Sequence, residues 1–345
     1  MRATHRRDAS AARLRALGAE PVRAEVLDVD SLRAAFQGCA TVIHCAGSVG
    51  APPAGRAWEA NAAGPANAVE AAAACGARRV VVTSSVLALG FGPRGRPGDE
   101  QTSVEPPGAL RYAASKREGE RRALAAGARA GVDVVVVNPG YVIGPPAEAD
   151  GAPGSSQIVG QYLRGRLPAV IGGQTNIVDV GDVADGHLRA AERGRAGERY
   201  VIGGHDIAWA ELIERIAELS RVRHPVLVLP PAVATAARAG ERVGLRAPMP
   251  AETLTSMGGN TRFSSRKAES ELGYRARPLD DTLRDTIAWF ETRIEAGAFD
   301  DGASSLARFA SWVRRADVVG ALAPVRAAER MLGRPFVAEI GRAHV

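Results

Sequence analysis

Several features that would place a chain in a functional class are scarce in this sequence of 345 residues. Its longest apolar runs, such as the one around Val134–Val137, are broken by charge, glycine or proline well short of the roughly 20 residues that a membrane span needs. No export signal opens the chain. The three cysteines (Cys39, Cys45 and Cys75) lack metal-ligand spacing and are too few for a disulfide framework. These absences predict a cytoplasmic protein without a membrane span, a metal or disulfides.

Lysine is almost absent. Only Lys116 and Lys267 occur, and arginine supplies every other basic position among the 44 lysines and arginines. The formal charge of +6 does not indicate a nucleic-acid partner, because the basic residues are scattered and acidic residues are interleaved throughout. A chain that otherwise avoids lysine is expected to use these two for chemistry or geometry that a guanidinium cannot supply.

What the sequence does contain is short apolar runs that alternate with helical patterns. Continuous runs of valine are typical of strands covered on both faces, and their alternation with helices is typical of a parallel sheet. We expect an α/β fold with a doubly wound, Rossmann-like parallel sheet and a smaller C-terminal substrate lobe. The expected strands are Arg2–His5, Pro21–Leu27, Thr41–His44, Arg79–Thr83 and Val132–Asn138, and the expected helices between them are Ala9–Leu17, Ser31–Phe36, Ala57–Ala74 and Tyr112–Ala130.

The pattern changes near residue 147. Residues 1–146 are expected to form an incomplete α/β domain and residues 147–299 the substrate lobe, with returns to the sheet within 176–202. Residues 300–338 are expected to be a helical extension, and residues 339–345 resemble the translation of a sequencing-library adapter. The individual elements expected after residue 147 are strands at Asn176–Val180 and Arg199–Ile202 and helical segments at Trp209–Leu219, Pro278–Ala296, Ser304–Arg315 and Val325–Leu332.

One group of polar residues has a chemical use. Tyr112 and Lys116 lie four residues apart near the start of an expected helix, so both side chains share one helix face. A phenol has an ordinary pKa of about 10, and a nearby ammonium would lower it and make Tyr112 a usable general acid or base. Ser85 follows a valine-rich strand, at the edge where parallel sheets place their ligands. We therefore expect a catalytic group in which Ser85 binds a carbonyl oxygen.

In this order and setting, the three residues resemble the catalytic group of the extended short-chain dehydrogenase/reductase family, over roughly residues 2–295. The similarity points to the branch that contains dihydroflavonol-reductase-like proteins and a hopanoid-associated sugar epimerase. It is carried by the segments Val42–Gly47, Asn138–Pro145, Val178–Ala184, Gly194–Gly204 and Ser264–Tyr274. The resemblance implies an enzyme whose first 146 residues bind NAD(P).

The resemblance also implies roles for single residues. Asn61 would be a fourth catalytic residue that supports proton relay. Asp28 would flank the adenine, the strand end at Pro139 would hold the nicotinamide carboxamide, and His44 would form a wall only. The implied cofactor contacts are Asp28, Val29, His44, Ala46, Gly47, Ser84, Tyr112, Lys116, Pro139, Gly140 and Val142.

The turn that binds pyrophosphate in this family is not found where the family has it. The family opens with a strand, a Gly-x-x-Gly-x-x-Gly turn and a helix, whereas here Arg2–His5 resembles the second strand of the family. The early glycines, Gly18, Gly38, Gly47 and Gly50, fall in other positions. We expect a chain that lacks the first βα unit of the family, and hence a sheet without its central strand.

Two arginines bear on the choice of cofactor. Arg6 and Arg7 stand where the second strand of the family ends. A basic residue there can pair with a 2′-phosphate, whereas an acidic residue would take the 2′-hydroxyl of NAD. The sequence therefore favours NADP, and NAD stays open as an alternative.

Three functions remain open at this point. The leading hypothesis is NAD(P)H-dependent reduction of a ketone or aldehyde in a small organic substrate, in which Tyr112 donates the proton. The first alternative is a sugar-nucleotide epimerase that keeps its NAD bound. The second is a non-catalytic cofactor-sensing module. A dehydratase is less favoured, because Val86 and Leu87 follow Ser85 where such relatives carry an acidic pair. A homodimer is left open.

Overall fold

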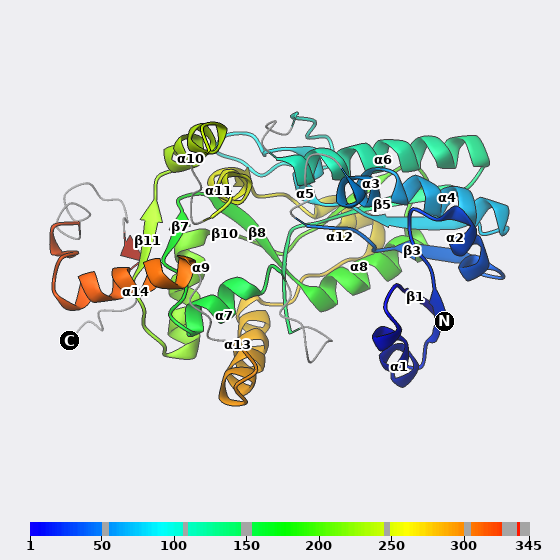
Figure 1. Ribbon diagram of the computed structural model, residues 1–345. Coiled ribbons are helices and arrows are strands. Elements are labelled where there is room, and N and C mark those ends of the chain that lie inside the picture. The colour runs from blue at the N-terminus through cyan, green and yellow to red at the C-terminus, as the bar shows by residue number, and fades with distance from the viewer. Residues whose placement is uncertain are drawn as a thin grey trace.

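The computed structural model describes residues 1–49, 55–105, 110–145, 154–244, 249–299, 305–325 and 337–338. It is an α/β structure in which parallel strands alternate with helices (Figure 1). Nowhere in these ranges is a helix both long and apolar enough to cross a membrane. The first half of the chain contains β1 (Arg2–His5), α1 (Asp8–Ala16), β2 (Glu20–Arg23), α2 (Val29–Phe36), β3 (Thr41–His44), α3 (Arg56–Ala62), α4 (Gly64–Ala74), β4 (Arg79–Thr83), α5 (Val86–Leu89), α6 (Arg111–Ala130) and β5 (Asp133–Pro139).

A four-stranded parallel sheet lies at the centre of this half, in the order β3, β4, β5, β9. Alternate valines of β4 point to opposite faces: Val80 and Val82 pack beneath α2, α4 and α6, and Val81 packs on the other side. There it meets α8 (Val180–Arg193) and α12 (Arg266–Leu272). Both faces of β4 are thus covered, which explains its continuous valine run, and the predicted parallel sheet is confirmed.

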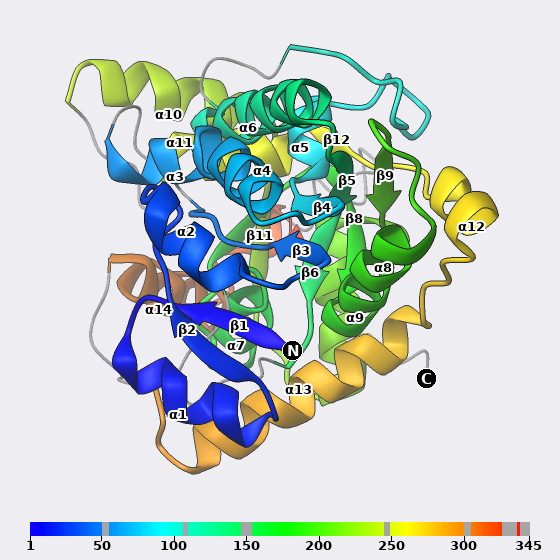
Figure 2. The same ribbon diagram turned by 90° about the vertical axis from the view of Figure 1, so that its right-hand side faces the viewer.

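The strands β1 and β2 form a separate parallel pair. Within the described residues, neither is hydrogen-bonded to β3. The β1–α1–β2 unit protrudes below the sheet at the right of Figure 1 and is shown from another side in Figure 2. Arg2 ties it to the end of α2 by donating to the carbonyl oxygens of Ala35 and Gln37. Beside this division Ile43 of β3 is 39% exposed, whereas Val81 of β4 is fully buried. The sheet is therefore divided where the sequence predicted that its central strand would be missing.

Helix α6 packs tightly against α3 and α4. A Cβ atom on Gly119 of α6 would lie 2.2 Å from the carbonyl oxygen of Asn61, so only glycine permits this approach. Pro65 has no N–H to donate to that carbonyl. The helix expected at Ala57–Ala74 consequently divides at Ala63 into α3 and α4.

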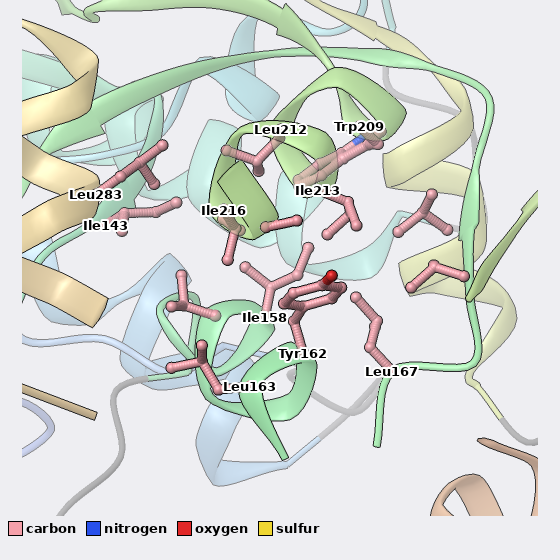
Figure 3. Packing of buried hydrophobic residues seen from close by; sticks show 14 of the residues in the cluster. Ile143, Ile158, Tyr162, Leu163, Leu167, Trp209, Leu212, Ile213, Ile216 and Leu283 are labelled. Atoms are coloured by element: carbon pink, nitrogen blue, oxygen red, sulfur yellow. The ribbon is translucent and has the colours of Figure 1, made fainter. Parts of the chain in front are cut away.

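The second half contains a large apolar cluster built on α7, α9 and α13 and on strands of two other sheets (Figure 3). Tyr162, Leu212 and Ile213 are fully buried in it. The elements of this half are β6 (Tyr141–Ile143), α7 (Gln157–Leu163), β7 (Ala169–Ile171), β8 (Gln174–Asp179), α8, β9 (Arg199–Ile202), β10 (His205–Ala208), α9 (Trp209–Ser220), β11 (Val226–Leu229), α10 (Ala232–Arg242), α11 (Ala251–Gly258), β12 (Asn260–Thr261), α12, α13 (Leu279–Glu295), α14 (Ser305–Val318) and β13 (Val337–Ala338).

Two expectations for this half need correction or stay open. Arg199–Ile202 does return to the main sheet as β9, but the segment expected at Asn176–Val180 does not. It forms β8 in another sheet, because β6, β10 and β12 supply its pairing partners. Most of the helical spacing noted at Val325–Leu332 lies outside the described residues.

Candidate active site

The candidate site lies at the carboxyl edge of the main sheet. In a parallel sheet the strand ends meet at one edge, so the residues that follow β3, β4 and β5 come together there. Ala46 and Gly47 follow β3, Ser85 follows β4, and Pro139 ends β5. Helix α6 begins at Arg111, immediately before Tyr112, and brings its first two turns to the same edge.

Ser85 is held at the start of a short helix. It is the N-cap residue of α5, and its hydroxyl accepts a hydrogen bond from the Leu87 N–H at 3.2 Å. The residue is 9% exposed. Its side chain also lies close enough to the Tyr112 phenol to influence its pKa. The structure thus brings together the two groups that the sequence analysis assigned to a carbonyl oxygen.

The pKa of Tyr112 differs in direction from the expectation. Burial raises it above its ordinary value, and the interaction with Ser85 opposes that rise. The expected lowering by Lys116 is not found. The position of Tyr112 is fixed by a residue that the sequence analysis missed: its N–H donates to the Glu252 carboxylate at 2.7 Å. Glu252 belongs to α11, so a helix from the second half of the chain holds the first turn of α6.

Lys116 is buried beneath this edge at 7% exposed. Its ammonium donates to the carbonyl oxygen of Thr83 at 3.0 Å, which directs it toward the end of β4. Burial lowers the pKa of Lys116 to about 8, while the charges of Cys45 and Glu120 oppose the lowering. The side chain therefore reaches the site as a partly desolvated cation.

Asn61 connects the loop after β3 to α6. Its amide oxygen accepts from the Ser48 N–H and its amide nitrogen donates to the Ser48 carbonyl, both at 2.8 Å. The same nitrogen donates to the Ser115 hydroxyl at 3.0 Å. A Cβ atom on Gly47 would lie 3.0 Å from the Asn61 oxygen and 3.1 Å from the Lys116 nitrogen. Gly47 thus keeps open a small space beside Lys116.

Thr83 and His187 form a pair that the sequence analysis also missed. The Thr83 hydroxyl lies 2.7 Å from Nε2 of His187, whose Nδ1 lies 2.7 Å from the Val183 carbonyl oxygen. Since a carbonyl can only accept, Nδ1 carries the proton and the Thr83 hydroxyl donates to Nε2. Burial lowers the pKa of His187. No local sequence pattern marks this pair, because Thr83 and His187 lie 104 positions apart.

His44 lies at the end of β3 and is 5% exposed. Burial, with a smaller effect of the Lys116 charge, lowers its pKa to about 3. Its Nε2 atom has no hydrogen-bond partner among the residues described. A neutral, packed ring agrees with the wall role that the resemblance implies, and that role stays a prediction.

The residues expected at the adenine end lie on the divided side of the sheet. Arg6 is 65% exposed and lies 3.8 Å from the Glu25 carboxylate, and Arg56 lies 3.0 Å from the same carboxylate. Arg7 is exposed and is the N-cap residue of α1. The Asp28 carboxylate accepts hydrogen bonds from two N–H groups of α2 and acts as the N-cap of that helix. Less of its hydrogen-bonding capacity therefore remains for an adenine. Arg56 was not found by the sequence analysis.

The remaining predicted contacts lie at the ends of β4 and β5 and on β6, apart from Val29, which is the first residue of α2. Ser84 is 5% exposed, and its hydroxyl has no partner within the described part of the chain. The side-chain oxygen of Asn138 is in the same situation. A Cβ atom on Gly140 would lie 2.6 Å from the Asn176 carbonyl oxygen, so glycine is required there. The Val142 carbonyl accepts from the Ser155 hydroxyl. Val29 packs against the core beneath α2.

Comparison with known proteins assigns the chain to a family. Residues 1–203 match the sequence profile of the NAD dependent epimerase/dehydratase family. The chain belongs to this family. The enzymes of this family depend on NAD(P).

Three relatives illustrate the range of the epimerase/dehydratase family. A protein of Synechocystis sp. named as a dihydroflavonol 4-reductase is 31% identical over 77% of this chain and 80% of its own length. Cinnamoyl-CoA reductase 1 of Oryza sativa is 34% identical over 57% of this chain and 60% of its own. The crystal structure of a nucleoside-diphosphate-sugar epimerase from Pseudomonas aeruginosa is 30% identical and superposes with a TM-score of 0.70, covering 86% of this chain and 90% of that one.

One end of the edge fits the cofactor of the epimerase/dehydratase family. The Lys116 ammonium lies beside Gly47, where it could donate to ribose hydroxyls, and the Ser84 and Asn138 atoms that have no partner among the described residues match a carboxamide, which both donates and accepts. The pyrophosphate end does not fit. The spacing Gly92, Gly95, Gly98 occurs, but the N–H groups of Gly92 and Gly98 bond to Asn260 and Arg262, and no helix follows within the described residues up to 105. No cluster of three potential metal ligands occurs in the described ranges.

Replacing Lys116 with methionine is expected to stabilise the folded chain at neutral pH. The unfolded lysine holds its proton up to pH 10.5 but the folded one only to about 8, so its charge destabilises the fold below pH 8. This penalty is at most on the order of 3 kcal/mol, and loss of the Thr83 hydrogen bond offsets about 1 kcal/mol of it.

Denaturant unfolding at pH 7 and pH 10 measures the effect. The advantage of Lys116→Met should shrink as the pH rises from 8 toward 10.5, because the folded lysine then sheds its buried charge while the unfolded lysine still holds its proton. A variant less stable than the parent at pH 7 would show that the ammonium stabilises the fold instead.

Proposed function

We propose that the protein reduces a ketone or aldehyde of a small organic substrate with NADPH. The observation that carries this proposal is the meeting of Ser85 and Tyr112 above the buried Lys116, at the edge where a parallel sheet binds ligands. The two relatives named as reductases support it. A complete Ser/Tyr/Lys group also argues against a non-catalytic cofactor-sensing module.

The chain's own residues divide the chemistry in this proposal. When bound, the nicotinamide supplies the hydride to the carbonyl carbon. Ser85 orients the carbonyl oxygen, and the Tyr112 hydroxyl gives that oxygen its proton as negative charge develops on it. Because burial raises the pKa of Tyr112, the phenol stays protonated at neutral pH, which is the form that a reduction needs. Lys116, still charged near pH 7 beneath this edge, would donate to ribose hydroxyls of the bound cofactor.

The test is a panel of ketones and aldehydes with NADPH consumption as the readout. It uses an N-extended chain, in which about 30 residues forming a strand, a glycine-rich turn and a helix precede Met1, the usual length of one such unit. We expect consumption with at least one aromatic or isoprenoid carbonyl. An absence of consumption across the panel, with NAD(H) retained through purification and interconversion of a sugar nucleotide, would support the epimerase alternative instead. The Pseudomonas relative keeps that alternative under consideration.

We also propose that Arg6 and Arg7 make the site prefer NADPH over NADH. Arg6 is exposed, and its only described ion pair, at 3.8 Å to Glu25, is long enough to yield to a phosphate. Replacing both arginines with alanine in the N-extended chain should lower the NADPH/NADH preference by about tenfold, since a charge-assisted contact contributes roughly 1.5–3 kcal/mol.

The matched control for this prediction is Arg33→Ala. Arg33 is an exposed arginine on α2 that pairs with Asp30 at 3.0 Å. Its replacement should leave the preference unchanged. If the double alanine variant keeps the parental ratio of kcat/KM for the two cofactors, Arg6 and Arg7 are surface residues without a role in selection.

A further inference from the structure

Helix α6 carries a third ionisable side chain in register with the catalytic pair. Tyr112, Lys116 and Glu120 follow one another at intervals of four, so they lie along one face of the helix. Glu120 is 1% exposed. The proposed function gives it no task. A buried carboxylate needs partners to offset the cost of its desolvation, and those partners indicate what it does.

The Glu120 carboxylate joins three strands. One oxygen accepts from the Arg199 guanidinium of β9 at 2.7 Å, and the other accepts from the Asn138 amide of β5 at 2.6 Å. The same Asn138 nitrogen donates to the carbonyl oxygen of Ser85 at 3.0 Å. Arg199 alone would have satisfied the charge. The second oxygen instead accepts from the Asn138 amide, which also binds the Ser85 carbonyl at the end of β4.

The charge of Glu120 also acts on Lys116, one helical turn away. Around Lys116, β3 contributes His44 and the following Cys45, α8 contributes His187, and α6 contributes Glu120. The pKa values of both histidines are lowered, so neither adds a positive charge near neutral pH. Glu120 is the carboxylate whose charge opposes the effect of burial on the pKa of Lys116. Without the charge of Glu120, burial would lower the pKa of Lys116 further.

We propose that Glu120 is a positioning residue, whose buried carboxylate lies one helical turn from Lys116 as a counter-charge and, through Asn138, fixes the strand end that carries Ser85. The inference rests on the proposed function only for the roles of Lys116 and Ser85. The ion pair, the hydrogen bonds and the helical spacing are independent of it. A reductase that needs a charged Lys116 would lose rate at the alkaline end of its range if Glu120 lost its charge.

The scarcity of lysine provides a direct test that needs no cofactor. Protein labelled with ¹³C at lysine Cε gives two lysine signals, and Lys116→Met identifies which belongs to Lys116. A pH titration of the 345-residue chain and of Glu120→Gln then compares the pKa of Lys116 in the two. We expect the variant to lower it by about 0.5 or more, as a charge lost one turn away in a partly buried site should do. An unchanged pKa would overturn the proposal.

The matched control is Glu118→Gln. Glu118 lies on the same helix, but it pairs with Arg121 and Arg122 at the surface and should leave the Lys116 titration where it was. Glu120→Asp keeps the charge and should bring the pKa of Lys116 back toward the parental value. A merely structural role for Glu120 would show no such dependence on charge.

A second variant covers the case in which Glu120→Gln does not fold. Replacing Glu120 and Arg199 together with glutamine leaves no unpaired buried charge, and such paired replacements are often tolerated. Arg199 is not among the groups that shift Lys116, so the pKa of Lys116 should still fall. An absence of carbonyl reduction in the substrate panel would reject the proposed function and leave this titration standing.

Discussion

Tyr112→Phe is expected to lower kcat of the N-extended chain by a factor of about 10²–10⁴, the usual contribution of a positioned general acid. The phenol is the group that can protonate the substrate oxygen beside Ser85, and its raised pKa keeps that proton available at neutral pH. The affinity for NADPH should change little, because Phe retains the ring and only the hydroxyl is lost. Single-turnover kinetics and a binding titration separate these two effects.

The matched control is Tyr162→Phe. Tyr162 is also buried, and its hydroxyl donates to the Val222 carbonyl oxygen at 3.0 Å inside the apolar cluster of Figure 3. Its loss should cost about 1 kcal/mol of stability and leave kcat unchanged. Turnover of Tyr112→Phe within a factor of a few of the parent would reject Tyr112 as the proton donor.

The 345-residue chain is expected to bind NADPH at least 10²-fold more weakly than the N-extended chain. Two charge-assisted amide contacts to a pyrophosphate contribute roughly 3–6 kcal/mol, and nothing at the described edge supplies them. The division between β1 and β3 adds to this, since each strand has one edge without a strand partner in the described part of the chain, and Ile43 is exposed beside them. Such edges promote aggregation, so the N-extended chain should also stay in solution at higher concentration.

Calorimetric titration of NADPH into both chains measures the difference. The control is the same N-extended chain with the glycines of its added turn changed to valine, which keeps the new strand but blocks close approach of the backbone to phosphate. This valine variant should be as soluble as the N-extended chain but should bind NADPH as weakly as the 345-residue chain. Tight, stoichiometric binding by the 345-residue chain would mean that the phosphates are held by residues other than a glycine-rich turn.

The strands of the main sheet could be predicted to within a residue or two. Valine runs buried on both faces mark β4 and β5 without knowledge of their neighbours. Pairing partners are less accessible: the apolar run at Asn176–Val180 has the composition of a strand of the main sheet, yet β8 lies in another sheet because β6, β10 and β12 surround it. Composition predicts that a strand forms, whereas its place depends on segments far along the chain.

The candidate site shows the same limit. Local spacing predicted Ser85, Tyr112 and Lys116, because a strand end and an i, i+4 pair are visible in a few residues. The contacts that fix them join residues far apart in the chain: Thr83 and His187 are separated by 104 positions, and Tyr112 and Glu252 by 140. No local sequence pattern predicts such contacts. The predicted direction of the Tyr112 pKa shift was wrong for a related reason: burial, a property of the whole fold, raises that pKa, and Lys116, the neighbour that spacing revealed, does not lower it.

The contact between Glu252 and the N–H of Tyr112 has a consequence for how such proteins diversify. Glu252 lies on α11, a helix of the side expected to vary as substrates change, yet it holds the first turn of the helix that carries the proton donor. A carboxylate at a helix N-terminus also stabilises that terminus electrostatically. A change of sequence that reshapes α11 around Glu252 is therefore expected to disturb Tyr112 as well, unless another group takes over the contact to its N–H.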